Sequence, residues 1–149
     1  MSGGGGASFN GGASVIVNSL FARNAAPVGV AVKVDSAAEV SLVHTTFAHS
    51  EPTEVVVTTG AAIRLEAAAT IRMTNTLISN HAIGIERVGG SAYEDYTLFS
   101  GVTTPYTGSV TSGGHSITGT AGFVNSGAGD YHLGLGSSAI NAGVNAGIA

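Results

Sequence analysis

The sequence has no cysteine and few charged residues, and both shortages exclude functions. Without cysteine the chain can form no disulfide, carry out no thiol chemistry and offer a metal no thiolate ligand. Lys, Arg, Asp and Glu make up 9% of the 149 residues, and the net charge is −4. The five basic residues are scattered, whereas nucleic-acid binding needs a clustered basic surface, so no nucleic-acid partner is expected.

Long apolar runs and targeting segments are also missing. No apolar run approaches the ~18 residues of a membrane span, so the sequence predicts no membrane insertion. Residues 1–6 lack the basic and apolar regions of a secretory signal peptide. We expect that the sequence has been trimmed at both ends. What the chain has in abundance is glycine, with 23 residues, together with Ala, Ser, Thr and Val, which favours turns and β structure.

One short phrase occurs three times. Its copies are residues 17–24, 43–50 and 74–81, and a degenerate fourth copy is 95–100. Internal repetition at this spacing indicates a solenoid. The alignment places four apolar residues in one anchor column that faces the core: Phe21, Phe47, Ile78 and Leu98.

A second column lies fifteen residues before the last three anchors, at Val32, Ile63 and Ile83. The chain alternates apolar and other residues around each of these positions, which is the period of a half-buried strand. Further alternating segments follow at 40–42, 71–73 and 91–93. A fixed module and one corner loop of variable length predict parallel strands, because each strand must pair with its copy in the next coil.

The expected fold is therefore all-β, a parallel β-helix of roughly four to five coils. We expect a flexible Gly-rich N-terminus at 1–12, coils at 13–121 and a closing segment at 122–149. Short polar residues just before the anchor column are expected to stabilise one turn of each coil. These residues are Asn18, His44, Asn75 and Asp95.

Two parts of the sequence resemble a known family. Residues 73–85, and the tail phrases 122–125, 129–133 and 136–143, resemble bacterial right-handed parallel β-helix repeat proteins. The tail is especially similar to the choice-of-anchor Q proteins of the pectate-lyase-like superfamily. Members usually have Pro at the positions of Ser126, Leu135 and Ser138, and Asp at Asn141 and Asn145. The resemblance implies a right-handed helix and an extracellular or cell-surface location, but no activity, because this fold carries many functions.

Charged residues form one candidate site. Asp35, Glu66 and Glu86 align, with Lys33 and Arg64 two positions earlier on the same face. A carboxylate row could bind Ca²⁺ or sugar hydroxyls. The preferred alternative is a solvated face on which the basic residues separate the acids.

The segment Tyr93-Glu94-Asp95-Tyr96 forms the second candidate site. Two acids flanked by tyrosines suit a sugar, which stacks on aromatic rings and hydrogen-bonds to carboxylates. The alternative is that Tyr93 fills the core and the acids are simply exposed. We prefer to look for a ligand here because the segment adjoins 101–121, which we expect to be irregular.

The five histidines show no metal-binding spacing. His49 and His81 are one position apart in the alignment, so they can approach each other across adjacent coils. A proton-transfer or metal role is open for this pair, although a polar turn residue is the simpler interpretation.

We expect a structural or adhesive module of a bacterial surface or secreted protein, with no enzyme activity, no cofactor and no metal. A polysaccharide or cell-surface glycan is the expected partner. One alternative is a carbohydrate-active lyase or epimerase. Another is a unit that self-associates by end-to-end stacking, because the end coils of a solenoid present unpaired backbone groups.

Overall fold

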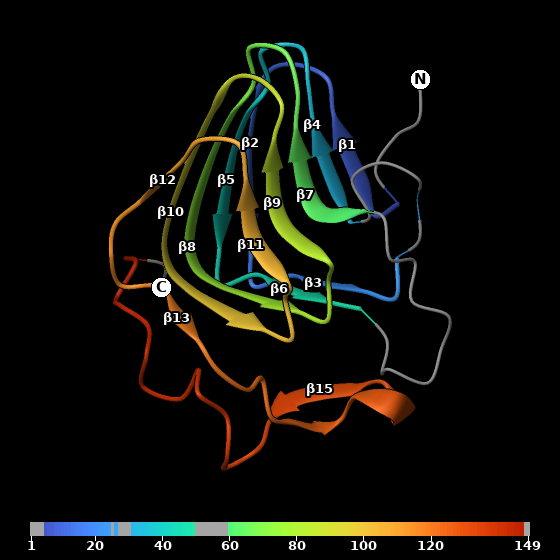
Figure 1. Ribbon diagram of the computed structural model, residues 1–149, viewed down its shortest axis with the longest axis vertical. Coiled ribbons are helices and arrows are strands. Elements are labelled where there is room, and N and C mark those ends of the chain that lie inside the picture. The colour runs from blue at the N-terminus through green and yellow to red at the C-terminus, as the bar shows by residue number, and fades with distance from the viewer. Residues whose placement is uncertain (1–4, 25, 27–30, 50–59, 148–149) are drawn as a thin grey trace.

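The computed structural model describes residues 5–24, 26, 31–49 and 60–147, and Figure 1 shows their arrangement. The described chain is all-β, with fifteen strands and one 3-10 turn at Ser126–Ala128. Five strands form sheet A, in the order β1 (Ala7–Phe9), β4 (Val32–Val34), β7 (Ala61–Leu65), β9 (Ile83–Arg87) and β11 (Thr104–Thr107).

Sheet B has eight strands. Its main path is β12 (Val110–Ser112), β10 (Ser91–Ser100), β8 (Thr70–Ser79), β5 (Glu39–Val43) and β2 (Ala13–Val17). The three short strands beside this path are β3 (Leu20–Ala22), β6 (Thr46–Ala48) and β13 (Ile117–Thr118). A separate hairpin pairs β14 (Phe123–Asn125) with β15 (Asp130–Leu133).

Every strand pair within the two large sheets is parallel. The chain alternates between sheet A and sheet B, so each strand lies beside its copy from the next repeat (Figure 1). We number the repeats 1 to 5 by the sheet A strand with which each begins. The prediction of parallel-stranded β structure is confirmed.

The anchor column is correct for three repeats and wrong for the fourth. Phe21 pairs with Phe47 and Phe47 with Ile78, but Ile78 pairs with Phe99 rather than Leu98. In sheet A, likewise, Ile63 pairs with Ile85 and not with Ile83.

The error arises because the turn between β9 and β10 is one residue shorter than its counterpart between β7 and β8. Fourteen residues separate Ile85 from Phe99, whereas fifteen separate Ile63 from Ile78. The short turn contains Gly90, which has a φ of 68°. A side chain at Gly90 would overlap the carbonyl group of Ala69 in the repeat below, so only glycine fits this turn.

A left-handed residue bends sheet B at the same place in successive repeats. Asn18, His44 and Asn75 have φ values of 49°, 51° and 53°. The fourth member of this corner column is Tyr96, with a φ of 54°, and not Asp95. Asparagine tolerates this backbone conformation better than most residues. The expected polar corner column is therefore present, but tyrosine occupies it in repeat 4.

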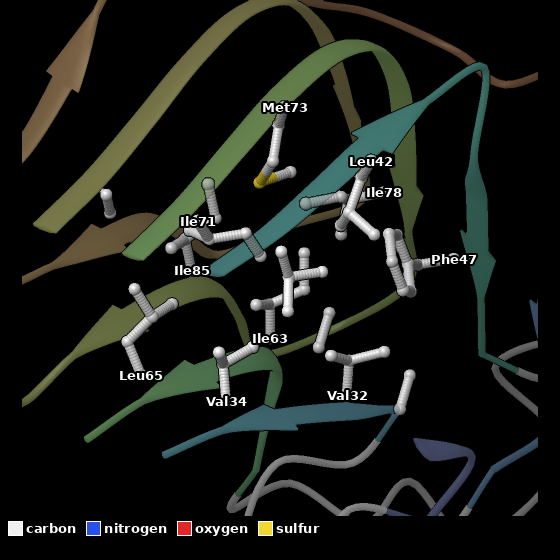
Figure 2. Close-up of a cluster of buried hydrophobic side chains, with 14 of the residues drawn as sticks. Val32, Val34, Leu42, Phe47, Ile63, Leu65, Ile71, Met73, Ile78 and Ile85 are labelled. Carbon is white, nitrogen blue, oxygen red and sulfur yellow. The ribbon is translucent and has the colours of Figure 1, made fainter. Parts of the chain in front are cut away.

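The core lies between the two sheets, and Figure 2 shows 14 of its side chains, ten of them labelled. Val32, Ile63 and Ile85 in sheet A are each fully buried, as are Phe47 and Ile78 in sheet B. Equivalent positions stack along the molecule: the rings of Phe21 and Phe47 are parallel within 10°, with centroids 5.1 Å apart. Each repeat thus contributes one layer to a continuous apolar column.

Two expectations about individual segments differ from the observed strands. Strand β1 lies within the segment 1–12 and pairs with β4, so part of that segment belongs to repeat 1. The segment 101–121 contains β11, β12 and β13, which form repeat 5 instead of an irregular region. Residues 1–4 and 148–149, to which the expectation of trimmed ends applies, lie outside the described residues.

Replacing Ile78 with Ala should lower the free energy of unfolding by about 2–5 kcal/mol, because it opens a cavity in a fully buried layer. The matched control is Ile140→Ala, at a side chain that is 43% exposed, and should change it by less than about 1 kcal/mol. Urea unfolding monitored by circular dichroism measures both. Equal effects of the two substitutions would contradict the position of the core.

Candidate functional site

A column of four apolar residues and one threonine points away from the core on the outer face of sheet B. Strand pairing aligns its five members, one per repeat: Leu20, Thr46, Leu77, Leu98 and Ile117. Leu77 and Leu98 are nevertheless buried, because Ala121, Phe123 and Ala139 of the C-terminal segment pack on them. Residues 121–147, the C-terminal segment, therefore cover part of this face.

Hydrogen bonds from side chains of the repeats, among them Asn75 and Arg23, hold the C-terminal segment against the repeats. Asn75 Nδ2 donates to the Val144 carbonyl at 2.7 Å, and the Val144 N–H donates to Asn75 Oδ1 at 2.9 Å. In repeat 1, Arg23 Nη2 donates to the carbonyls of Ser126 and Gly127 at 2.9 and 2.6 Å. The segment thus runs back from repeat 5 alongside the earlier repeats, as the orange and red trace in Figure 1 shows.

A groove separates the corner column from the C-terminal segment. It consists of two cavities of about 310 and 570 Å³. They share three lining residues, His44, Thr46 and Tyr131. The larger cavity also reaches Asn18 and His132, and the smaller one reaches Tyr96 and His115. We call the two cavities together the groove.

Tyr96 and His115 form an aromatic wall at one end of the groove. Their rings are parallel within 5°, with centroids 4.6 Å apart. The pairing of Leu98 with Ile117 places His115 directly after Tyr96 in the corner column, so the two rings stack at about the strand spacing. Both rings line the smaller cavity of the groove.

Asp95 orients His115. Its Oδ1 accepts hydrogen bonds from the backbone N–H of His115 at 3.1 Å and from that of Tyr96 at 3.0 Å. His115 Nδ1 lies 3.0 Å from both carboxylate oxygens. Partial burial opposes ionisation of Asp95, but the hydrogen bonds with His115 and Tyr96 outweigh it and lower the pKa of the carboxyl group.

A second acid–histidine pair lies on the opposite wall. Asp130 Oδ1 lies 2.6 Å from His132 Nδ1 and accepts the His132 N–H at 3.0 Å. These hydrogen bonds lower the pKa of Asp130. Between the two residues, Tyr131 packs edge-on against Phe123 and accepts a hydrogen bond from Arg23 Nε at 3.3 Å. The groove thus has tyrosine and histidine side chains on both sides, and the carboxylate of Asp130 on one of them.

The candidate site at 93–96 is divided by the structure. Tyr96 lines the groove, whereas Tyr93 and Asp95 share the outer face of β10 and line a separate surface cavity. The Arg72 guanidinium lies 4.5 Å from the ring centre of Tyr93. Glu94 is 3% exposed and pairs with the core residue Met73. The alternative, with Tyr93 in the core and exposed acids, is also wrong, because the one-residue shift in repeat 4 exchanges the two faces.

Glu94 is a buried carboxylate with hydrogen-bond partners. Tyr106 Oη donates to it at 2.6 Å, and the Ser116 hydroxyl donates to its other oxygen. Ser116 Oγ in turn accepts the Thr97 N–H at 2.9 Å. Burial and the adjacent carboxylate raise the pKa of Tyr106. This network ties repeat 5 to repeat 4, because Tyr106 and Ser116 both follow β10 in the chain.

The predicted carboxylate row does not form. In sheet A, Lys33 pairs with Arg64 and Arg64 pairs with Glu86. The column that contains Glu86 therefore holds two basic residues instead of two acids. Arg64 donates to Glu66 at 2.8 Å and to Glu86 at 2.7 Å. Lys33 Nζ lies 2.9 Å from Glu66 and 3.2 Å from Asp35. The acids are thus members of an ion-pair ladder, as the preferred alternative expected, although Lys33 is buried rather than solvated.

Sequence reasoning missed most of the groove. His115 could have been placed by extending the repeat into 101–121, where Leu98 and Ile117 mark the step. The opposite wall, Asp130 to His132, belongs to a tail whose position no repeat specifies. The proximity of His49 and His81 is confirmed, with ring centroids 5.5 Å apart.

Comparisons with protein-family models, with curated proteins and with solved structures found no match to this chain. Within the described ranges, no helix is long and apolar enough to cross a membrane. Among the same residues, no group of three or more His, Cys, Asp or Glu side chains could hold a metal ion.

The ladder predicts a pH dependence. The hydrogen bonds from Lys33 and Arg64 lower the pKa of Glu66, so its contribution to stability is present above the unfolded value of about 4.3 and is lost as the pH falls through the folded one. The melting temperature of Glu66→Gln should therefore lie below that of the wild type at pH 7, and the difference should shrink below about pH 4. Calorimetric scans from pH 7 to pH 3 measure it.

Glu39→Gln, at an exposed carboxyl group in β5, is the control and should follow the wild type at every pH. A difference between Glu66→Gln and the wild type that stays constant down to pH 3 would contradict the ladder.

Proposed function

We propose that the chain is a right-handed parallel β-helix that serves as a structural or adhesive module of a bacterial surface or secreted protein, and that its groove binds a glycan. The parallel pairing of five successive repeats and the left-handed corner residues support the β-helix. The handedness and the location rest on the resemblance of residues 73–85 and of the tail to choice-of-anchor Q proteins.

The stacked Tyr96–His115 wall is the observation that carries glycan binding. A sugar ring has an apolar face that packs on a flat aromatic surface, and hydroxyl groups that need acceptors close by. Tyr131 lines the same cavity as the stack and also the larger cavity, where Asp130 is a further acceptor. Asp95 lines neither cavity and acts through its hydrogen bonds to His115. The groove therefore offers aromatic rings and hydrogen-bond acceptors along its length.

The charges of the groove favour a neutral glycan. Asp130 in the larger cavity and Asp95, which holds His115 from outside the groove, both have a lowered pKa and are ionised at neutral pH. The cation nearest to Tyr131 is Arg23, and its guanidinium already donates to Ser126, Gly127 and Tyr131. A polyuronate would bring further carboxylates next to two acids, which is repulsive.

One feature favours a second candidate, a carbohydrate-active lyase or epimerase. Asp95 engages Nδ1 of His115, which leaves Nε2 of a partly exposed imidazole as a candidate general base. Such enzymes must also stabilise the negative charge that develops when a proton is removed. Neither cavity is lined by a lysine or an arginine in the described part of the chain, so binding without turnover is the better supported function.

End-to-end stacking is a further proposal and concerns the free edges of the sheets. In the described residues, no strand pairs with the outer edge of β1 or β2 in repeat 1, nor with that of β11 or β12 in repeat 5. Such edges recruit other strands unless something covers them. Translation along one axis gives open rods instead of closed oligomers.

Glycan binding is tested by replacing Tyr96 with Asn. Asparagine occupies the same left-handed corner position in repeats 1 and 3, so the substitution removes the ring and keeps the backbone. Tyr93→Asn is the matched control, because it removes an exposed tyrosine that does not line the groove. Titration with neutral oligosaccharides identified on a glycan array should show at least a tenfold weaker affinity for Tyr96→Asn only.

Absence of any neutral glycan ligand at millimolar concentration, or equal losses for Tyr93→Asn and Tyr96→Asn, would contradict a binding groove. The enzyme alternative predicts new products from the same oligosaccharides or from polyuronates. Loss of those products in His115→Gln would replace the binding proposal with the enzyme.

Stacking should appear as a sedimentation coefficient that rises with protein concentration. A lysine at Thr111, an exposed position in the outer strand β12, should suppress the rise because a charge opposes edge pairing. Val124→Lys, at an exposed residue of β14 that is not on this edge, is the control. A wild-type protein that stays monomeric across the series would contradict stacking.

A further inference from the structure

Two buried histidines lie side by side where repeats 2 and 3 end, just after the last sheet B strand of each repeat. His49 follows β6 and is 8% exposed, and His81 follows β8 and is 5% exposed. Their ring centroids are 5.5 Å apart and their planes are tilted by 44°. The pairing of Ala48 with Ser79 brings them together, since the chain continues from both strands at the same end.

Three of the four ring nitrogens are buried without a hydrogen-bond partner among the described residues. They are Nδ1 and Nε2 of His49 and Nε2 of His81. A buried polar atom left without a partner destabilises the folded state. Most buried polar groups in proteins are satisfied, so three such atoms in one place indicate that something else binds there.

The chemistry and burial of the pair suit a Lewis acid. Burial disfavours the charged form of an imidazole, and a neutral imidazole keeps a lone pair on one ring nitrogen. Neutral imidazole is a ligand for Zn²⁺, Cu²⁺ and Ni²⁺. Two imidazoles bound to one tetrahedral zinc, with Zn–N bonds of about 2.0–2.1 Å, have ring centroids about 5 Å apart.

We propose that His49 and His81 are two ligands of a transition-metal ion of the class that imidazole prefers, with exchangeable ligands such as water in the other positions. The site is separate from the groove, because neither histidine lines it. Bound metal would join repeats 2 and 3 and would stabilise the folded state by mass action, because the unfolded chain does not hold the two rings together.

The experiment adds ZnCl₂, NiCl₂ or CuSO₄ to chelator-treated full-length protein at pH 7.5, with calorimetric titration and melting curves. We expect one ion per chain for at least one of the three metals, and a melting temperature that rises with metal concentration. His49→Gln and His81→Gln should each weaken binding at least tenfold. The control is the double variant His44→Gln/His132→Gln, which removes two groove histidines and should bind as the wild type does.

A second measurement uses the wild type alone, so it does not depend on the folding of the buried-site variants. Long-range ¹H–¹⁵N NMR spectra report the ring nitrogens of each histidine, and metal should shift those of His49 and His81 at one equivalent. Wild-type protein that binds none of the three metals would overturn the proposal. So would binding that survives in His49→Gln and His81→Gln, or ring shifts confined to His44, His115 and His132.

Discussion

The structure depends on the in-register pairing of each strand with its own copy in the next repeat. This constraint places like residues on top of one another, so Phe21 stacks on Phe47 and each of Val32, Ile63 and Ile85 fills one layer of the core. It also repeats the left-handed corner from Asn18 to Tyr96. A substitution at one position therefore alters the contacts of its equivalents in the neighbouring repeats, whether that column is apolar, charged or aromatic.

The same pairing builds the groove. A column that faces outward in every repeat offers Leu77 and Leu98 as an apolar surface, and the C-terminal segment covers that surface instead of leaving it in water. The segment contacts the repeats at Arg23 and at Asn75, and two cavities remain between it and the corner column. The space that remains is lined by the polar and aromatic residues of two different structures, the corner and the β14–β15 hairpin.

The sequence predicted the class of fold and most of the register, since the repeated phrases carry both. The predicted register is wrong after the turn at Gly90, which is one residue shorter than its counterpart. The alignment assumed a constant 15-residue spacing, so it could not detect a shorter turn that only glycine permits. That single shift moved Glu94 from the surface to the core and Tyr96 into the corner column. The C-terminal wall of the groove was unpredictable for another reason: Tyr131 reaches Arg23 across 108 residues of sequence, and no repeat encodes that contact.

The central claim is that the C-terminal segment lies along the side of the repeats and thereby forms the groove. The most direct test is a set of nuclear Overhauser effects from the side-chain amide of Asn75 in the isotope-labelled protein. The account predicts contacts from this amide to the backbone of Val144, which lies 2.7–2.9 Å away in the two hydrogen bonds. Contacts from Val144 to the outer strands β12 and β13 instead, with none to Asn75, would mean that the segment closes the end of the molecule and that no groove exists.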